Sequence, residues 1–593
     1  MEKAQGITWD LSALYSSDTD PKIEQDIETA QKLAQDFKQK YHGKISGSAC
    51  DATLLLNALQ DYENLLAHIY RPYAMASLLF SGDGRSDTYK AFIARVQELY
   101  TKINNTTLFF SLEIQKIEDE HLQKMLTDER LKPYSHHLHS LRLFTPYTLS
   151  EREEQLINHK NLTGKTAFVN LFNEFTSSFE WQFEIDGETK TMTESDLRQL
   201  VRSADAELRR RAKAALDGKY GENALIFTNI FGNLIRDHAG EMELRGYDSP
   251  IQPSYLRNDV PGEVVETMMR VTAEHYHLAR SYYTIKARLL GVPRLAGSDL
   301  YAPIDTSETK IPFEQGKELV LDSFTAFSAE FGSIMQRAFD ERWIDAEIRP
   351  GKRGGAFCHG ILPSVHPYVL LNYVDNLDSV YTMAHELGHA LHDVLSAEKQ
   401  TLLTYHPPLV LAETASVFAE MLLTKKLLRE ETDQKRRIQI IASKLEDFFG
   451  TISRQTMYTY FELDAHLEGA KRRLSAEDFS RLWLKRRDEM YGDVVDFLPE
   501  EKWFWAVIPH FIHTRFYCYA YTFGALLVLA LYDQYEKEGE PFVPKYRALL
   551  AAGDSDTPEN LIRSMGMDFR DENFWRGGFR VISDLLDELQ ALV

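Results

Sequence analysis

Almost every long segment of the chain spaces its apolar residues as an amphipathic helix does, and this feature limits the fold to a mainly helical architecture. Residues 22–42 place Ile23, Ile27 and Ala30 three or four positions apart, and residues 52–130 continue in the same style with few helix breakers. No repeat of fixed period is present, so we expect helical hairpins rather than a solenoid. A chain of 593 residues exceeds what one hydrophobic core usually holds, which predicts several domains or two large lobes.

One β-hairpin interrupts the helical pattern in the N-terminal half. Apolar and polar residues alternate over positions 179–185, and Asp186-Gly187 then supplies a tight turn. Thr193, with Asp196 three residues later, predicts a helix start that resembles a capping box.

The pattern also suggests a division of the chain. We expect an N-terminal helical region over residues 1–195, with the hairpin near 179–193, and a second, catalytic region over residues 196–593. Residues 246–262 are rich in Pro, Ser and Asn, and such a composition predicts a loop at a lobe boundary or a functional loop.

Residues 349–376 differ from the helical background. They begin with a glycine-rich loop, RPGKRGGAFCHG, that leads into a short strand, and residues 367–373, PYVLLNY, form a second strand-like run. The glycines match neither GxGxxG nor GxxxxGKS/T, so a phosphate-binding loop is not indicated. A glycine-rich strand edge can instead let another backbone approach closely.

Charge, cysteine content and hydropathy limit the partners and the cellular compartment that we expect for this chain. The 67 Lys and Arg against 89 Asp and Glu leave a net charge of −22, which argues against nucleic acid or an anionic membrane as the main partner. Cys50, Cys358 and Cys518 lie far apart in the sequence, which is typical of a reducing compartment. The N-terminus lacks the pattern of a signal peptide, and the longest uncharged run, between Arg515 and Asp533, predicts a buried helix rather than a membrane span. We therefore expect a cytoplasmic protein.

The most informative motif is His385-Glu386-Leu387-Gly388-His389, an H-E-x-x-H pattern. Residues four apart share a helix face, so the imidazoles of His385 and His389 can reach one metal ion. Glu386 beside them can act as general base toward a metal-bound water. Apolar residues cluster on the opposite side of this helix: Val380, Met383, Leu387, Leu391 and Val394. The helix therefore has an apolar back and a histidine front, as a ligand helix that lines a cleft requires.

A catalytic zinc needs a third protein ligand, and two residues compete for that role. His392 follows His389 by three residues, but three ligands on one straight helix would crowd a tetrahedral ion. Glu413 lies 24 residues after His389, on a second helix that follows Pro407-Pro408. Two helices joined by a loop can bring Glu413 to the histidine pair, so Glu413 is the better candidate.

Two further side chains, Glu420 and His392, are candidates to support this centre. Ser416 and Glu420 lie on roughly the same helical face as Glu413. Ligand histidines usually donate their free N–H to a carboxylate, so we predict Glu420 as that partner, with a plain salt bridge as the alternative. For His392 we expect packing or a hydrogen bond behind the ligands.

Residues 509–524, PHFIHTRFYCYAYTFG, concentrate hydrogen-bond donors. If one continuous helix begins at Pro509, four donors share a face: His510, His513, Tyr517 and Tyr521. Tyr519 then points away from them. Such a stripe could supply donors to the oxyanion that forms when water attacks a peptide carbonyl. The alternative is a polar network buried between helices.

These motifs together resemble a known family. HELGHALH, followed 24 residues later by ETASVFAE, is similar to the thimet-oligopeptidase-like zinc peptidases, and within them to bacterial oligoendopeptidase F. The segments TWDLSALY, RGYDSPIQPSYLRND, GAFCHG, PYVLLNY and GMDFRDENFWRGG also resemble that group. The resemblance runs from near residue 7 almost to the end of the chain.

The resemblance implies a fold and a metal centre. The expected fold is mainly α: a two-lobed helical clamshell with a small β-sheet beside the zinc-binding helices and a deep substrate channel. The expected cofactor is one zinc ion per chain, with His385, His389 and Glu413 as ligands and Glu386 as general base.

The same resemblance implies residues that contact the substrate. The family's catalytic donors map onto His510, Tyr517 and Tyr521. His513 beside them would contact the substrate. The family's glycine-rich strand, which would hold the substrate backbone by β-augmentation, maps onto Gly354, Gly355 and Ala356.

The leading hypothesis is a zinc endopeptidase that acts on short unfolded peptides. A zinc exopeptidase is the first alternative, but the G-x-M-E-N segment of the similar aminopeptidases does not precede His385. A helical peptide-binding protein with a structural metal is the second. The sequence favours neither a monomer nor a homo-oligomer.

Overall fold

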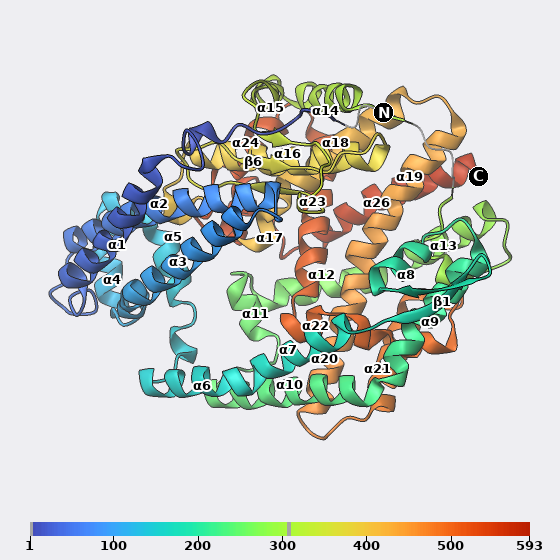
Figure 1. Cartoon of the computed structure of the whole chain (residues 1–593), viewed down its shortest axis with the longest axis horizontal. Coiled ribbons are helices and arrows are strands. Elements are labelled where there is room, and N and C mark those ends of the chain that lie inside the picture. Colours follow the sequence, from blue (N-terminus) through green and yellow to red (C-terminus); the bar gives the residue numbers. More distant parts are fainter. Residues whose placement is uncertain (1–3, 305–309) are drawn as a thin grey trace. The chain divides into compact units, whose positions relative to one another are not determined.

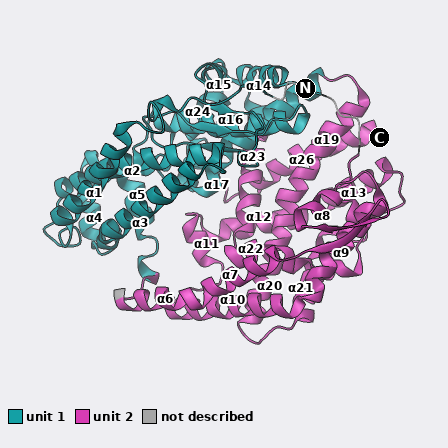
Figure 2. Cartoon of the chain, in the orientation of Figure 1, with its two compact units in different colours: residues 1–146, 308–430, 534–568 teal, residues 147–307, 431–533, 569–593 magenta. Residues whose placement is uncertain are grey.

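The computed structural model describes residues 4–304 and 310–593 (Figure 1). The fold is mainly helical with three small sheets, which confirms the predicted fold class. The chain forms two compact units, each assembled from three segments (Figure 2). Unit 1 comprises residues 1–146, 308–430 and 534–568, and unit 2 comprises residues 147–307, 431–533 and 569–593. The division at residue 195 stays a prediction.

Unit 1 combines the first helices of the chain with those that surround the H-E-x-x-H motif. Its helices are α1 (Pro21–Tyr41), α2 (Ala52–Gly82), α3 (Asp87–Gln115), α4 (Asp119–Met125), α5 (Ser135–Arg142), α14 (Phe313–Phe327), α15 (Ala329–Asp340), α16 (Leu377–Ala397), α17 (Leu409–Ala412), α18 (Thr414–Glu430), α24 (Phe542–Ala551) and α25 (Pro558–Ser564). Helix α23 (Cys518–Glu538) begins in unit 2 and ends in unit 1.

The first helix shows how the sequence pattern becomes structure. α1 begins at Pro21, directly after Asp20, whose carboxylate accepts a backbone N–H of the first turn. Ile23 and Ile27 are buried, as predicted, in a core shared with α2 and α3. That core also includes Tyr368, so the N-terminal helices support the sheet that precedes α16.

The sheet of unit 1 contains the two strands predicted around the glycine-rich loop. Its strands are β4 (Ile344–Asp345), β5 (Phe357–His359) and β6 (Tyr368–Leu370). Their order is β4-β6-β5, with β4 parallel and β5 antiparallel to β6. β5 therefore lies at an edge of the sheet, directly after the glycine-rich loop.

The glycine-rich loop is fixed to the sheet by buried charges. Asp345 of β4 is fully buried, and its carboxylate lies 2.7 Å from the Nζ of Lys352 and 2.6 Å from the guanidinium of Arg349. Asn372 Nδ2 donates to the carbonyl of Gly355 at 2.7 Å. Because a buried carboxylate is stable only when its charge is matched, these contacts hold the loop in one conformation.

Unit 2 contains the remaining helices, together with two two-stranded sheets. Its helices are α6 (Glu151–Thr163), α7 (Lys165–Ser177), α8 (Glu194–Leu200), α9 (Ala206–Glu222), α10 (Ala224–Arg245), α11 (Gln252–Arg257), α12 (Gly262–Glu274), α13 (Tyr276–Leu289), α19 (Gln434–Phe448), α20 (Arg454–Gly469), α21 (Ala476–Tyr491), α22 (His510–His513) and α26 (Glu572–Leu592).

The predicted hairpin is confirmed. β1 (Trp181–Ile185) pairs antiparallel with β2 (Glu188–Met192). Asp186 and Gly187 both have positive φ, 56° and 81°, as the turn between two such strands requires. The capping box of Thr193 at the start of α8 is also confirmed.

Two local expectations differ from the structure. Residues 246–262, expected as a loop, contain helix α11. The C-terminal part, expected as helix almost throughout, contains β7 (Val495–Asp496), which pairs in parallel with β3 (Leu295–Ala296). Strands of two residues carry no periodic signal, so the sequence cannot reveal them.

The donor-rich segment is not one continuous helix, so the condition under which four donors share a face is not met. α22 ends at His513, and α23 begins only at Cys518. Between them Phe516 has a φ of 54°, and its backbone N–H donates to Glu462 of α20 at 2.9 Å. Phe516, held by Glu462 in a non-helical conformation, therefore lies in the break between α22 and α23.

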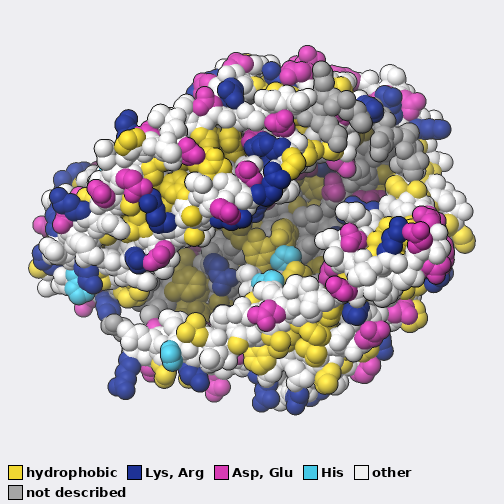
Figure 3. All heavy atoms as spheres, viewed as in Figure 1, with side chains coloured by type: hydrophobic (Ala, Val, Ile, Leu, Met, Phe, Trp, Pro, Cys, Tyr) yellow, Lys and Arg dark blue, Asp and Glu magenta, His cyan; other side chains and the backbone are white. Residues whose placement is uncertain are grey.

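The predicted burial of the uncharged run is confirmed, because most side chains of α23 from Cys518 to Tyr532 are buried. Across residues 4–304 and 310–593, length and composition qualify no single helix as a membrane span, although Pro499–His513 and Cys518–Glu538, bent by 83°, qualify as a pair. Acidic and basic side chains are interspersed on the face shown in Figure 3.

Candidate metal centre

Helix α16 carries the H-E-x-x-H motif as predicted. It begins after Asn376, whose side chain accepts the N–H of Ser379. Most of its apolar side is buried, including Met383, whereas Val394 near its end is half-buried. His385 and His389 are only partly buried and share the other side.

The second ligand helix approaches α16 closely because of a glycine. A Cβ on Gly388 would lie 2.5 Å from the carbonyl oxygen of Ala415 and 2.6 Å from the Cα of Ser416. These distances leave no room for any side chain at position 388. Glu413 lies at the junction between α17 and α18, one turn before this contact.

Three possible ligand atoms meet beside α16. His385 Nε2 lies 3.4 Å and His389 Nε2 lies 3.5 Å from Glu413 Oε2, and one ligand atom of each residue lies within 4.8 Å of the others. A tetrahedral ion with bonds of about 2.0–2.1 Å separates its ligand atoms by about 3.3–3.4 Å. The spacing therefore fits zinc, and no second group of this kind occurs among residues 4–304 and 310–593.

Two polar side chains orient these ligands. His385 Nδ1 lies 2.7 Å from Glu420 Oε1, where the sequence placed a candidate partner. This contact leaves Nε2 to face the metal position. Ser416 Oγ donates to Glu413 Oε2 at 2.6 Å, which fixes the orientation of that carboxylate.

Burial and neighbouring charges set the protonation of the centre. Burial lowers the pKa of His385, but the hydrogen bond to Glu420 and the nearby carboxylates outweigh it and raise that pKa to about 9. Burial lowers the pKa of His389 to about 4, so this ring is neutral and able to bind a cation. Burial, with a contribution from Glu413, raises the pKa of Glu386 to about 7.

A cavity of about 590 Å³ lies beside Glu386 within unit 1. Its walls come from β5, from α16 and from the residues before α17. They include Ala356, His359, Glu386, His389, His392 and His406. The predicted general base therefore borders a space that a substrate can enter, and β5 forms one wall of it.

The edge strand β5 is held against α16 by a buried carboxyl group. Asp393 Oδ2 lies 3.7 Å from the Sγ of Cys358, and a Cβ on Gly360 would lie 2.4 Å from the same oxygen. Burial raises the pKa of Asp393 to about 7. The backbone N–H of Cys358 also faces Glu386 and lowers its pKa. The strand and the general base are thus linked directly.

The other predicted residues of unit 1 lie near this cavity. Ala356 lies on its wall, and Gly354 and Gly355 precede it in the loop. Gly355 has a φ of 79°, a conformation that favours glycine. His392 is buried one turn after His389, and its role stays a prediction.

The donor-rich segment lies in unit 2, where the helix break divides it. The rings of His510, Tyr517 and Tyr521 remain together, with centroids 5.1–5.7 Å apart. His513 instead turns to α7, where its Nε2 lies 2.7 Å from Asn173 Oδ1. Tyr519, expected to point away from this group, contacts Ser254 and Asn258: its hydroxyl accepts from Asn258 Nδ2 at 2.6 Å and donates to the carbonyl of Ser254 at 3.0 Å.

Sequence reasoning missed two residues that build the centre. Gly388 allows the two ligand helices to approach closely. The sequence does contain a signal for it, because a glycine inside a helix lowers helix stability and therefore usually has a packing or functional reason. Asp393 fixes β5, but a single carboxylate one turn beyond a ligand histidine carries no sequence signal of its own.

Comparison with known proteins assigns these motifs to a family. The family model described as Peptidase family M3 matches residues 199–580, and that described as Oligopeptidase F matches residues 113–181. The chain is 27% identical to oligopeptidase PepF of Bacillus subtilis over 591 residues, which cover 99% of this chain and 87% of that protein. It is also 27% identical to an oligoendopeptidase F homolog of Lactococcus lactis, over 100% of this chain and 98% of that one.

Solved structures share the fold. A Chlamydophila abortus protein has a TM-score of 0.89 at 24% identity, with 99% of this chain and 98% of that chain covered. Oligoendopeptidase-F from Enterococcus faecium has a TM-score of 0.71 at 24% identity, with 96% and 98% covered. The resemblance seen in the sequence is thereby confirmed. The Peptidase family M3 model matches more than half of the chain, and the chain therefore belongs to peptidase family M3.

Proposed function

We propose that this chain is a zinc-dependent endopeptidase that hydrolyses internal peptide bonds of short unfolded oligopeptides. The observation that carries the proposal is the spacing of the ligand atoms of His385, His389 and Glu413 beside Glu386. The M3 family is a metallopeptidase family, and the relatives are named oligopeptidase and oligoendopeptidase. Both findings support peptide hydrolysis.

Zinc held by these three residues would polarise the scissile carbonyl and lower the pKa of water. Glu386 then acts as general base: its carboxylate accepts a proton from the attacking water and passes it to the leaving amine. Glu420 keeps His385 oriented throughout, because its carboxylate accepts from Nδ1.

The substrate backbone is proposed to pair with the free edge of β5. This strand borders the cavity beside Glu386 and has a partner, β6, on one side only. Main-chain hydrogen bonds to an edge strand recognise an extended peptide without regard to its side chains. Gly354, Gly355 and Ala356 would let the peptide approach, because glycine leaves the backbone uncovered.

His510, Tyr517 and Tyr521 are proposed as donors to the oxyanion, with His513 in contact with the substrate. Their support is that three of the four rings form one cluster in unit 2 and that Tyr521 is an exposed residue. Their role is independent of metal binding, so the two parts of the proposal are tested separately.

The test is cleavage of an internally quenched peptide blocked at both ends, by zinc-loaded protein with and without a chelator. The proposal expects cleavage that the chelator abolishes. Glu386→Gln should retain zinc and lose turnover by several orders of magnitude, because only the base is removed. Glu398→Gln, at the end of the same helix and paired with Arg547 at 2.7 Å, is the matched control and should cleave normally.

Other outcomes assign other functions. Cleavage of free peptides but not of blocked ones would identify an exopeptidase. Tight peptide binding without any product would identify a binding protein with a structural metal. Turnover by Glu386→Gln at the wild-type rate would refute the mechanism while leaving the metal centre intact.

A further inference from the structure

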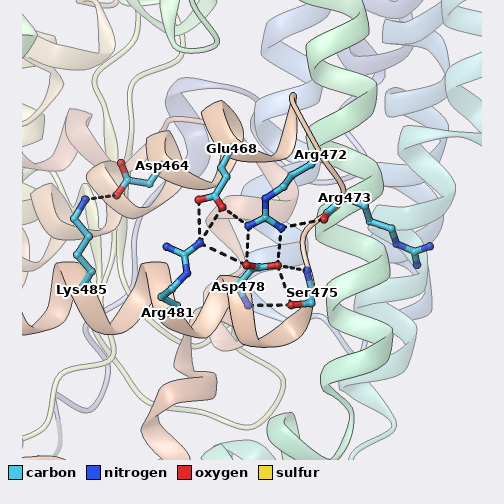
Figure 4. A network of polar contacts seen from close by, with 8 residues as sticks. All are labelled: Asp464, Glu468, Arg472, Arg473, Ser475, Asp478, Arg481 and Lys485. Atoms are coloured by element: carbon cyan, nitrogen blue, oxygen red, sulfur yellow. Dashed lines mark hydrogen bonds and ion pairs between the residues drawn. The ribbon is translucent and has the colours of Figure 1, made fainter.

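Unit 2 pairs its basic side chains with carboxylates, both in its interior and on its surface. Three interior pairs are Arg209–Asp299 at 2.7 Å, Lys286–Glu446 at 2.5 Å and Arg486–Asp464 at 2.8 Å. On the surface, Arg472 and Arg481 share Glu468 and Asp478 in the network of Figure 4. This is expected, because an uncompensated charge away from water is strongly unfavourable.

Arg454 has no pair of this kind among residues 4–304 and 310–593. It is the first residue of α20 and follows a π-helical turn, Phe449–Ser453. Its guanidinium donates to the hydroxyl of Tyr301, a partner that carries no charge at neutral pH. Among residues 4–304 and 310–593, no carboxylate lies within ion-pair distance of it. Within the described part of the chain, this cation therefore has no carboxylate partner.

The backbone around Arg454 is shaped to hold it. A Cβ on Gly450 would lie 2.9 Å from a guanidinium nitrogen, so this glycine makes room for the charged group. The π turn that contains Gly450 is itself an uncommon conformation that recurs at functional sites. The ring of Tyr301 lies 5.4 Å from the Arg454 guanidinium and 5.2 Å from that of Arg202, which makes the neighbourhood more positive.

Arg454 borders a small cavity inside unit 2. The cavity measures about 50 Å³, and through it Arg454 stays partly accessible although it lies deep in the unit. Its other walls are mainly apolar, with Leu300, Met457, Trp483, Phe497 and Phe504. The carboxylate on its wall, Glu501, is already engaged at 3.3 Å from the Nζ of Lys213.

We propose that this cavity is a binding site for a monocarboxylate that carries a short apolar group. The carboxylate would accept parallel N–H bonds from Arg454, the geometry in which guanidinium groups bind carboxylates most strongly. The apolar group would occupy the space lined by Met457 and Phe504, which offers no hydrogen bonds. A volume of about 50 Å³ holds a few water-sized groups, which accommodates the carboxylate and the first carbons of a short apolar group.

Two sources share this chemistry: a free short-chain acid and the C-terminal carboxylate of a peptide that ends in a small apolar residue. The site belongs to unit 2 alone and requires no metal. It therefore goes beyond the proposed peptidase activity and can be tested in the metal-free protein.

The test is ligand-observed saturation-transfer NMR on the full chain. Isobutyrate represents the free acid, N-acetylvaline represents the peptide terminus, and isobutyramide has the shape of isobutyrate without its charge. We expect saturable binding of isobutyrate, of N-acetylvaline or of both, and none of isobutyramide. The acid that binds more tightly identifies the source. Failure of both acids to bind, or equal binding of the amide, would overturn the proposal.

Variants locate the binding. Arg454→Met should weaken it about tenfold or more, because the charge-assisted bonds are lost. Arg454→Lys keeps a cation without the parallel donors and should weaken it less, so it remains informative if the methionine variant fails to fold. Arg481→Gln, in the network of Figure 4, is the matched control and should bind as the wild type does. Wild-type binding by both Arg454 variants, or equal competition by inorganic phosphate, would refute this site.

Discussion

Replacing Gly388 by alanine is expected to pull the metal centre apart. The added Cβ would lie 2.5 Å from the carbonyl oxygen of Ala415, whereas ordinary contacts at such positions begin at 3.4 Å. The two helices must therefore separate by 3.4 − 2.5 = 0.9 Å. Glu413 precedes Ala415 by two residues, so a shift of α18 carries this ligand away from α16.

The consequence for the ligands follows from the same number. His389 Nε2 lies 3.5 Å from Glu413 Oε2, and an additional 0.9 Å would leave the carboxylate too far to share a zinc ion with the histidines. We expect zinc affinity to fall by more than the 10- to 100-fold that loss of an outer hydrogen-bond partner costs. Activity at subsaturating zinc should fall about 100-fold or more, as misplacement by 1 Å does elsewhere.

The assay combines zinc affinity, measured by competition with a fluorescent chelator, with cleavage of the blocked peptide and thermal unfolding. Overpacking costs about 1–3 kcal/mol, and alanine returns up to about 1 kcal/mol of helix propensity, so the variant should remain folded. Gly240→Ala in α10 is the control, because nothing lies within 4 Å of its added Cβ. If Gly388→Ala binds zinc and cleaves peptide as the wild type does, close helix contact does not set the ligand spacing.

Three further predictions address other contacts. Glu420→Ala removes the acceptor of the His385 Nδ1–H and should weaken zinc binding about 10- to 100-fold. Glu420→Gln should weaken it less. Unchanged zinc affinity in both variants would contradict the role of Glu420 in orienting His385. Burial raises the pKa of Glu462 from its ordinary value of 4.5 to about 8, so the native state loses stability as pH rises through this range. The Tm of Glu462→Gln should therefore lie above that of the wild type at pH 8.5 and equal it at pH 5. The same difference in Tm at both pH values would refute this. Tyr517→Phe and Tyr521→Phe each remove one phenolic hydroxyl. Loss of the hydroxyl that donates to the oxyanion should lower kcat about 100- to 1,000-fold at unchanged zinc content, whereas a wild-type kcat in both variants would exclude both tyrosines as donors.

The part of the metal centre that could be predicted is the part set by residues close together in the sequence. The spacing of His385 and His389 on an amphipathic helix is a property of one continuous segment, so the sequence alone places both rings on one face. Glu413 could be proposed because a loop followed by a helix limits where it can lie. The approach of α18 to Gly388 depends instead on the packing of two helices, which no single segment encodes.

The cluster of His510, Tyr517 and Tyr521 also depends on a contact that the local sequence does not encode. Helical arithmetic from Pro509 placed His513 with the other rings, but it assumed that the helix continues through residue 516. Glu462 of α20 accepts the N–H of Phe516, and this residue adopts a positive φ, so the segment turns and only His510 keeps its place beside the tyrosines. A carboxylate fifty-four positions earlier in the chain thus decides which donors converge. Because burial raises the pKa of Glu462, the contact that turns the segment also makes the stability of the native state depend on pH.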